Sequence, residues 1–356
     1  MPRVVGRRGA VVLLCVVALV ASGAVAWGAG LWRGDTRPSL GAAMAAAPAD
    51  AVTWNYTDWQ SIESMLGRRA SPSAFATAAD ERDLATRSVL ATSAGEMSRT
   101  LGWSVRDLRW ESYSATRGGE LAAVRLDDVS PSAVRAGLRK AGYRSQGRTW
   151  TLARTKVAEA GLSDLMTRVV VLDRQRTVVM ASTAALLDRG VRTIRGTSPS
   201  LAGRRAAVDA AEALSGSQTI ALQVATGACG ATAVTDEQAQ RQAEAAQERV
   251  GRLRPYVIGA RGIEDPGGRG FAQTARFALR FADPEEAREQ QPVRAALSTG
   301  AYIGRSGQVS DTLRFRSADV QAATLTLSYA HDPATEVFMI GTGPALFASC
   351  GTDTGS

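Results

Sequence analysis

A stretch of 24 residues without a charge, residues 9–32, constrains this chain more than any other feature. A helix of about 20 apolar residues is long enough to cross the roughly 30 Å hydrocarbon core of a membrane. Arg3, Arg7 and Arg8 precede the stretch. Because basic flanking residues stay in the cytoplasm, we expect residues 1–8 to form a cytoplasmic basic tail and the rest of the chain to be exported.

Two interpretations of this segment remain open. As a signal anchor, residues 9–32 stay in the membrane as a single-pass transmembrane helix. As a signal peptide they are cleaved after Ala26, because Ala24 and Ala26 form a small-residue cleavage site. The anchor is favoured, since apolar sequence continues to Trp32. The first interpretation predicts an extracytoplasmic domain at the cell membrane, and the second predicts a secreted protein.

The composition of the remaining chain predicts folded domains. The chain is 45% hydrophobic and 21% charged, too apolar for a disordered protein. Residues 33–50 are rich in Ala, Gly and Pro, which predicts a linker. The rest is long enough for two domains of ordinary size. We place a first α+β unit at residues 51–205 and a second at residues 206–356.

The cysteines predict one structural disulfide. Cys15 lies in the apolar stretch, which leaves Cys229 and Cys350 in the exported part. Two thiols in an oxidising compartment usually pair. The alternative is a redox or nucleophilic pair, but the chain has no CxxC motif and neither cysteine has a histidine nearby. The single histidine excludes a multi-histidine metal centre, and we expect no cofactor.

Hydrophobic alternation and turn residues predict β-hairpins over residues 108–128, 143–152 and 168–181. Ser-Pro at residues 130–131 and Asp-Pro at residues 283–284 predict helix starts. Further helix is expected over residues 73–101, with Gly102 closing it, and a strand over residues 336–340.

A strand–helix–strands pattern occurs twice. Residues 124–181 and 278–340 share it, and the spacing agrees: Leu126 to Leu172 and Phe281 to Leu327 both span 46 residues. In this alignment residues 325–328 correspond to residues 169–172. We therefore predict an α+β fold with two repeated antiparallel sheet-plus-helix units after the membrane segment. A single larger mixed sheet is the alternative.

The residues that could carry catalysis have simpler interpretations. His331 is expected in a surface turn between two strands. Asp80, Glu81 and Asp83 are expected near a helix start, where acids complement the helix dipole. The glycines of residues 262–270 predict a hairpin loop rather than a phosphate cradle. These interpretations favour a protein without enzymatic activity. The alternative is a secreted or anchored hydrolase whose site is assembled from scattered carboxylates and Ser/Thr.

The basic residues are unevenly distributed. The formal net charge is +8, but residues 99–205 hold 20 basic and 9 acidic residues, a net +11. Export makes nucleic acid an improbable partner. Anionic lipid headgroups or anionic wall polymers would fit such a surface, and a merely solvated arginine-rich surface is the alternative. The candidate contact residues are Arg135, Arg139, Lys140, Arg144, Arg174 and Arg176.

The layout resembles a group of exported actinobacterial proteins of unknown function. The resemblance rests on the single N-terminal membrane segment, Pro-Ala-Asp at residues 48–50 and Ser-Leu-Ala-Gly at residues 200–203 before a helix. It implies an extracytoplasmic location in the cell envelope and assigns no catalytic residue. We therefore expect a membrane-anchored protein with a binding or scaffolding role.

Overall fold

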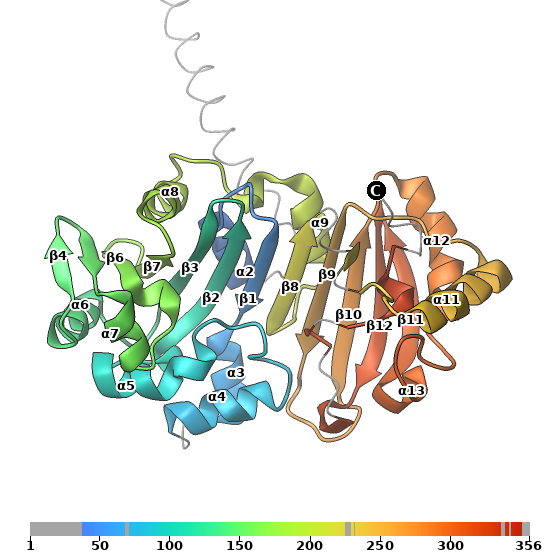
Figure 1. The fold of residues 1–356 in the computed structure, drawn as a ribbon, viewed down its shortest axis with the longest axis horizontal. Helices are drawn as coiled ribbons and strands as arrows, with labels where there is room; N and C mark the ends of the chain where they lie inside the picture. The colour runs from blue at the N-terminus through green and yellow to red at the C-terminus, as the bar shows by residue number, and fades with distance from the viewer. Residues whose placement is uncertain are drawn as a thin grey trace, which may run out of the picture. The chain divides into compact units, whose positions relative to one another are not determined.

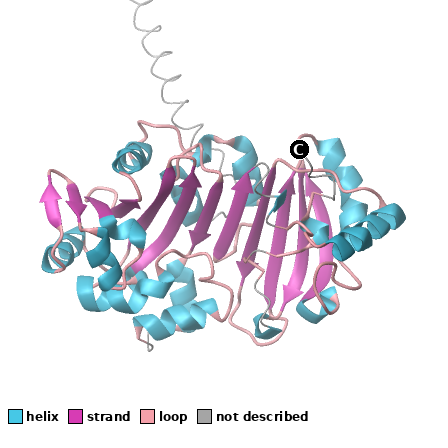
Figure 2. Cartoon of the chain, in the orientation of Figure 1, coloured by secondary structure: helices cyan, strands magenta, loops and turns pink. Residues whose placement is uncertain are grey.

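The fold is an antiparallel β-sheet of 12 strands with helices packed against it (Figure 2). This computed structural model describes residues 38–67, 71–224, 229–230, 232–335, 339–341 and 343–350. All the strand pairs are antiparallel, which confirms the predicted α+β class. The two predicted units contribute strands to one sheet, so the single-sheet alternative holds, although the sheet is purely antiparallel rather than mixed.

The strands are β1 (Thr53–Thr57), β2 (Leu108–Thr116), β3 (Gly119–Leu126), β4 (Arg144–Gln146), β5 (Thr149–Thr151), β6 (Arg168–Leu172), β7 (Thr177–Ala181), β8 (Thr219–Val224), β9 (Ile258–Glu264), β10 (Gln273–Arg280), β11 (Leu313–Gln321) and β12 (Thr324–His331). The α-helices are α2 (Pro38–Ala46), α3 (Trp59–Leu66), α4 (Pro72–Asp80), α5 (Ala94–Leu101), α6 (Pro131–Lys140), α7 (Arg154–Glu159), α8 (Ala184–Ile194), α9 (Arg205–Glu212), α11 (Glu237–Val250), α12 (Pro284–Leu297) and α13 (Val309–Thr312).

Strands β1 and β8 pair at the middle of the sheet (Figure 1). From β1 outward the order is β1-β2-β3-β7-β6-β5-β4, and from β8 outward it is β8-β9-β10-β12-β11. We call strands β1–β7 the first half and strands β8–β12 the second half. By position β11 corresponds to β6 and β12 to β7. The predicted alignment of residues 325–328 with residues 169–172 is therefore shifted by one strand.

Each face of the sheet has its own layer of helices, because side chains alternate along a strand. Trp54 and Tyr56 point to one face, where α2, α8 and α9 pack. Asn55 and Thr57 point to the other face. There the main hydrophobic core lies under α3–α6 in the first half. In the second half it lies under α12 and the C-terminal segment, by which we mean residues 339–341 and 343–350. Buried Glu111 of β2 joins the sheet to α3 on this face, since its carboxylate accepts a hydrogen bond from the indole of Trp59 at 3.1 Å.

The predicted linker at residues 33–50 is, from Pro38 onward, a packed helix. Leu40, Ala43 and Met44 of α2 are buried, and the Ser112 hydroxyl of β2 donates to the Ala43 carbonyl at 2.9 Å. Small residues are typical of flexible linkers, but they also let a helix approach a sheet closely. Composition alone could not distinguish these two uses.

The other local predictions have mixed outcomes: the hairpins and the helix starts are confirmed, and the long helix is not. The three hairpins form, as β2–β3, β4–β5 and β6–β7. The Ser130 hydroxyl caps α6 by accepting from the Ala133 amide at 3.1 Å, and the Asp283 carboxylate caps α12. The expected helix over residues 73–101 is instead α4 and α5, separated by an irregular turn. Of the predicted strand at residues 336–340, residues 336–338 lie outside the described residues, and residues 339–340 are not in a strand.

Cys229 and Cys350 form the predicted disulfide, with Cα atoms 5.1 Å apart and a separation of 121 positions in the sequence. Within the described ranges no helix is long and apolar enough to cross a membrane. Residues 1–37, which include the predicted membrane segment, lie outside those ranges.

Gly137 allows α6 to pack against the end of α5. A Cβ atom at this position would lie 1.9 Å from the main-chain oxygen of Leu101. We predict that Gly137→Ala destabilises the fold by about 1–3 kcal/mol through overpacking, although alanine is the better helix former. Gly203→Ala is the control, because no atom lies within 4 Å of its added Cβ. Urea unfolding of both variants measures the difference, and equal stability of the two would contradict the predicted contact.

Candidate functional site

The six predicted anionic-contact residues divide into two groups. Arg135 is not free, since it forms an ion pair with Asp173 at 2.7 Å. Arg176 turns inward, and its guanidinium donates to the Asp127 carbonyl at 2.6 Å and to the Val129 carbonyl. Arg135 joins the β6–β7 turn to α6, and Arg176 joins it to the residues between β3 and α6. Both arginines are therefore structural.

The other four candidates are exposed: Arg139, Lys140, Arg144 and Arg174. In the described part of the chain none of them forms an ion pair. Lys140 ends α6 and Arg144 begins β4, at the outer end of the first half (Figure 1). The Arg135–Asp173 ion pair ties α6 to the turn that carries Arg174. We call these four residues the basic end.

Not every arginine of the basic block adds to this surface. Arg148 pairs with Asp188 at 3.2 Å, Arg154 pairs with Asp164, and Arg189 pairs with Asp50 at 2.8 Å. Asp164 and Asp188 are already subtracted in the net +11 of residues 99–205, but Asp50 lies outside this range, so its pairing with Arg189 lowers the uncompensated charge of the block. Arg139 also places its guanidinium over the Trp150 ring, 5.7 Å from the centroid, which orients it on the α6 surface.

The prediction of a surface turn at His331 is wrong. Strand β12 extends through this residue, which pairs with Gln273 of β10 and Leu313 of β11 and is fully buried. Its Nδ1 lies 3.2 Å from the Thr312 carbonyl, and burial lowers the pKa of the imidazole. Among the described residues no serine or cysteine nucleophile hydrogen-bonds to this ring, so the geometry offers no catalytic triad here.

The acidic group at residues 80–83 also differs from its prediction. It lies at the end of α4 rather than at a helix start. Asp83 has a left-handed backbone (φ 57°) and a fully buried side chain. Its carboxylate accepts from the Ile340 amide at 2.8 Å and from the Thr86 hydroxyl at 2.8 Å. The hairpin loop predicted at residues 262–270 forms at residues 265–272, between antiparallel strands β9 and β10, because residues 262–264 still belong to β9.

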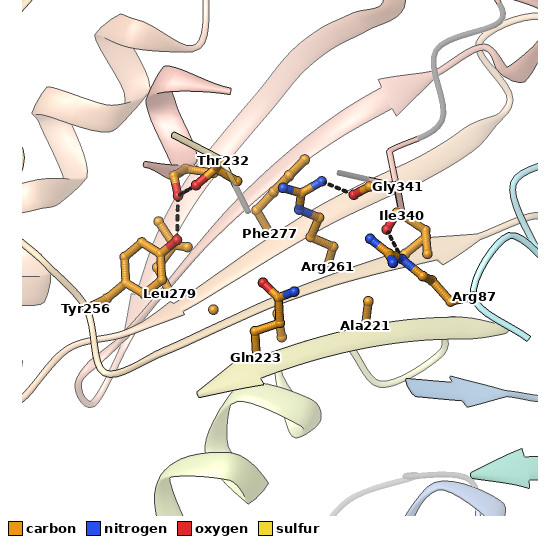
Figure 3. A pocket seen from close by; sticks show the side chains of 13 residues that line it. Arg87, Ala221, Gln223, Thr232, Tyr256, Arg261, Phe277, Leu279, Ile340 and Gly341 are labelled. Carbon is orange, nitrogen blue, oxygen red and sulfur yellow. Dashed lines mark hydrogen bonds between the residues drawn. The ribbon is translucent and has the colours of Figure 1, made fainter. Parts of the chain in front are cut away.

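A second arginine cluster, which the sequence did not reveal, holds the C-terminal segment (Figure 3). Arg87 donates from its Nε to the Ile340 carbonyl at 2.9 Å. Arg261 of β9 donates to the Met339 and Gly341 carbonyls at 3.2 and 2.5 Å. The segment is thus bound by its main chain, through donors that lie far from it in the sequence.

Arg294 of α12 also binds main-chain carbonyls of the C-terminal segment, further along the chain. It is fully buried, and it donates to the Phe347 and Ser349 carbonyls at 2.8 and 2.9 Å. The Tyr256 hydroxyl and the Thr232 hydroxyl both donate to the Ala348 carbonyl, at 2.6 and 2.9 Å. The disulfide at Cys350 closes the attachment.

These arginines carry charge in an apolar environment. Burial lowers the pKa of both Arg261 and Arg294 to about 10. Both remain protonated at neutral pH, and carbonyl oxygens and aromatic faces supply their contacts. Arg261 lies over the Phe277 ring, and Arg294 lies over the ring of Tyr256, each 5.5 Å from the centroid. A charge without these partners would be costly in this environment.

The space between the segment and the sheet is small. The cavity beside Arg87, Gln223 and Arg261 has a volume of about 20 Å³ (Figure 3). That is room for about one water molecule. The arginines of this cluster bind main-chain carbonyls of the C-terminal segment, so the cluster serves to hold the segment. Within the described ranges no group of three or more His, Cys, Asp or Glu side chains is placed to hold a metal ion.

Sequence patterns could not single out Asp83, Arg87, Arg261 and Arg294. Their main-chain partners, carbonyls and an amide, lie between 40 and 257 residues away. The one available signal was that Arg261 and Arg294 lie on a strand and a helix that also carry buried apolar residues.

Comparisons with known proteins give no family. No protein-family model and no curated protein matches the chain. Two crystal forms of a protein named TP0453 match it among solved structures, with TM-scores of 0.41 and 0.40. The first covers 85% of this chain and 96% of that chain at 10% identity, and the second covers 82% and 94% at 8% identity. We base no conclusion on likeness at this level.

Asp83 predicts a pH dependence of stability. Burial raises the pKa of its carboxyl to about 7. Between about pH 4 and pH 7 the folded state therefore binds more protons than the unfolded state, and stability falls as the pH rises. We predict that Asp83→Asn removes a slope of at most about 1.4 kcal/mol per pH unit over this range. Asparagine also tolerates the left-handed backbone.

Chemical unfolding at pH 4, 5, 6 and 7 measures this effect. The free energy of unfolding of the wild type minus that of Asp83→Asn should fall with pH and level off above about pH 7. Asp188→Asn is the control, because Asp188 is exposed and 53% of its side chain is accessible. A pH-independent difference for Asp83→Asn would show that this carboxyl has an ordinary pKa.

Proposed function

We propose that this chain is a membrane-anchored extracytoplasmic protein with a binding role in the bacterial cell envelope. Its basic end would contact the anionic headgroups of the membrane lipids. The observation that supports this most is the group of four exposed cations without acidic partners at one end of the sheet. Arg135, Arg148 and Arg154 of the same block are paired with acids, whereas within the described ranges these four residues are not.

The anchor and the export are part of this proposal. They rest on the uncharged residues 9–32 and the three preceding arginines. The oxidising compartment that export implies agrees with the disulfide between Cys229 and Cys350. The resemblance to exported actinobacterial proteins belongs to the same proposal.

We also infer that the two halves are copies of one unit. Both begin with a helix followed by a strand, α2–β1 and α9–β8. Both then have two strands, a helix and two final strands, with β4, β5 and α7 inserted after the helix in the first half. In both halves the final two strands occupy the sheet in reversed order. This agreement supports a duplicated strand–helix–strands unit in which β11 corresponds to β6 and β12 to β7.

Anionic lipid binding should depend on the basic end. A Lys or Arg near an anionic membrane contributes about 1 kcal/mol, and salt weakens this attraction. We predict that changing all four residues of the basic end to Gln lowers affinity for anionic bilayers at least roughly tenfold. The full chain in zwitterionic nanodiscs, passed over immobilised phosphatidylglycerol bilayers at increasing salt, measures this.

The control variant changes four exposed arginines elsewhere to Gln and should bind like the wild type. These are Arg195, Arg241, Arg252 and Arg288. Equal losses in both variants would point to net charge rather than to the basic end. Binding that does not weaken with salt would contradict the electrostatic contact. Binding to a soluble anionic phosphodiester polymer, without binding to the bilayer, would replace lipid by wall polymer as the partner.

A further inference from the structure

A cavity of about 880 Å³ lies in the second half, between α11, the end of α12 and the loop of residues 299–309. Its volume is within the range of small-molecule binding sites, roughly 300–1,000 Å³. It is much larger than the water-sized space beside Arg261. Neither the basic end nor the C-terminal attachment accounts for it.

One wall of this cavity is apolar. It is formed by Ala246 and Val250 of α11, Leu297 of α12, and Leu346 and Phe347 of the C-terminal segment. The small Ala246 belongs to an apolar cluster that includes Leu346. Alanines along α11 keep its inner face thin, which leaves room between this helix and α12.

The cavity carries positive charge. Arg249 and Arg305 line it, and no carboxylate side chain is found among its described lining residues. The Arg305 guanidinium stacks on the Tyr302 ring at 3.8 Å. The Nε of Arg305 is buried and has no hydrogen-bond partner within the described structure. A buried donor of this kind is typical of a position where a ligand acceptor binds.

The loop that carries Arg305 is held at its base. The Tyr302 amide donates to the Gly307 carbonyl at 2.9 Å, and the Val309 amide donates to the Gly300 carbonyl at 2.8 Å. Val309 and Tyr302 are buried, which fixes both sides of the loop. The hydrogen bonds and the buried side chains of the loop therefore fix this wall of the cavity, and binding sites are usually pre-formed in this way.

We propose that this cavity binds a single-chain amphiphile with a carboxylate head, that is, a long-chain fatty acid. The hydrocarbon chain packs against the wall formed by Ala246, Val250, Leu297 and Leu346. The carboxylate accepts from Arg305, and the exposed Arg249 adds a second positive charge. An anionic head is required because the lining offers two cations and no acid, and a single chain matches the volume.

Photolabelling of the full chain in zwitterionic nanodiscs tests this site. A palmitate analogue with a diazirine in its chain is irradiated, and the labelled peptides are mapped by mass spectrometry. We expect saturable labelling of residues 242–250 and 296–309. Unlabelled palmitate should compete at least roughly tenfold better than hexadecanol, because a charge-assisted hydrogen bond is stronger than a neutral one.

Two pairs of variants locate the ligand. Ala245→Trp fills the cavity from an exposed lining position and should abolish labelling, whereas Glu244→Trp, one residue away and outside the lining, should not. Arg305→Gln should weaken palmitate binding roughly tenfold, and Arg288→Gln on α12 should leave it unchanged. Ala296→Trp, also at an exposed lining position, replaces Ala245→Trp if that variant does not fold.

Three results would overturn the proposal. They are no saturable labelling, labelling that both cavity-filling variants retain, and equal competition by palmitate and hexadecanol. The last would show that the site, even if it binds a chain, does not recognise an anionic head. The outcome is independent of the basic end, since the four-residue Gln variant should label like the wild type.

Discussion

The pairing of β1 with β8 is the interaction on which the rest of the structure depends. Asn55 lies opposite Ala221, so that Trp54 and Tyr56 share a face with Leu222 and Ile220. A shift by one residue would turn each of these side chains to the opposite face. The pairing therefore fixes which face of each half receives α2 and α9 and which receives the main core. Every other strand is added outward from these two, and a continuous sheet results from two similar sets of strands.

The two halves cover the main-core face by different means. In the first half, the segment between β1 and β2 supplies α3, α4 and α5. The corresponding segment between β8 and β9 is shorter and supplies α11, and the C-terminal segment covers part of the remaining face. In residues 339–341 and 343–350 this segment has no strand partner, so its carbonyls need donors from the sheet and from α12. Arg261 and Arg294 are long enough to reach them, and their apolar stems pack in the core. Buried arginine is thus a consequence of covering a sheet with irregular chain.

The parts of the fold that could be predicted from the sequence are the local ones. Hairpin turns and the Ser130 and Asp283 caps depend on residues a few positions apart, and these form as predicted. The predictions for residues 38–50, Asp83 and His331 did not hold, because their environment is made by distant residues. His331 becomes buried only when β10 and β11 pair on either side of β12. Likewise, four of the six predicted contact residues remain exposed, and the other two bind Asp173 and two main-chain carbonyls, contacts that a charge count along the sequence does not show.

Arginine has three uses in this chain, and the partner decides which one applies. Paired with a nearby carboxylate, as in Arg148–Asp188, it is an exposed ion pair of small energetic value. Surrounded by carbonyls, as Arg294 is, it fixes the main chain in the core. Left without either partner, as at the basic end or at the Nε of Arg305, it retains the capacity to bind an anion. The two sites proposed here are of this third kind. At the basic end the nearby acid Asp173 is paired with Arg135, and the described cavity lining around Arg305 contains no acid. For that reason function in this protein is to be sought at its uncompensated cations rather than at its most basic sequence.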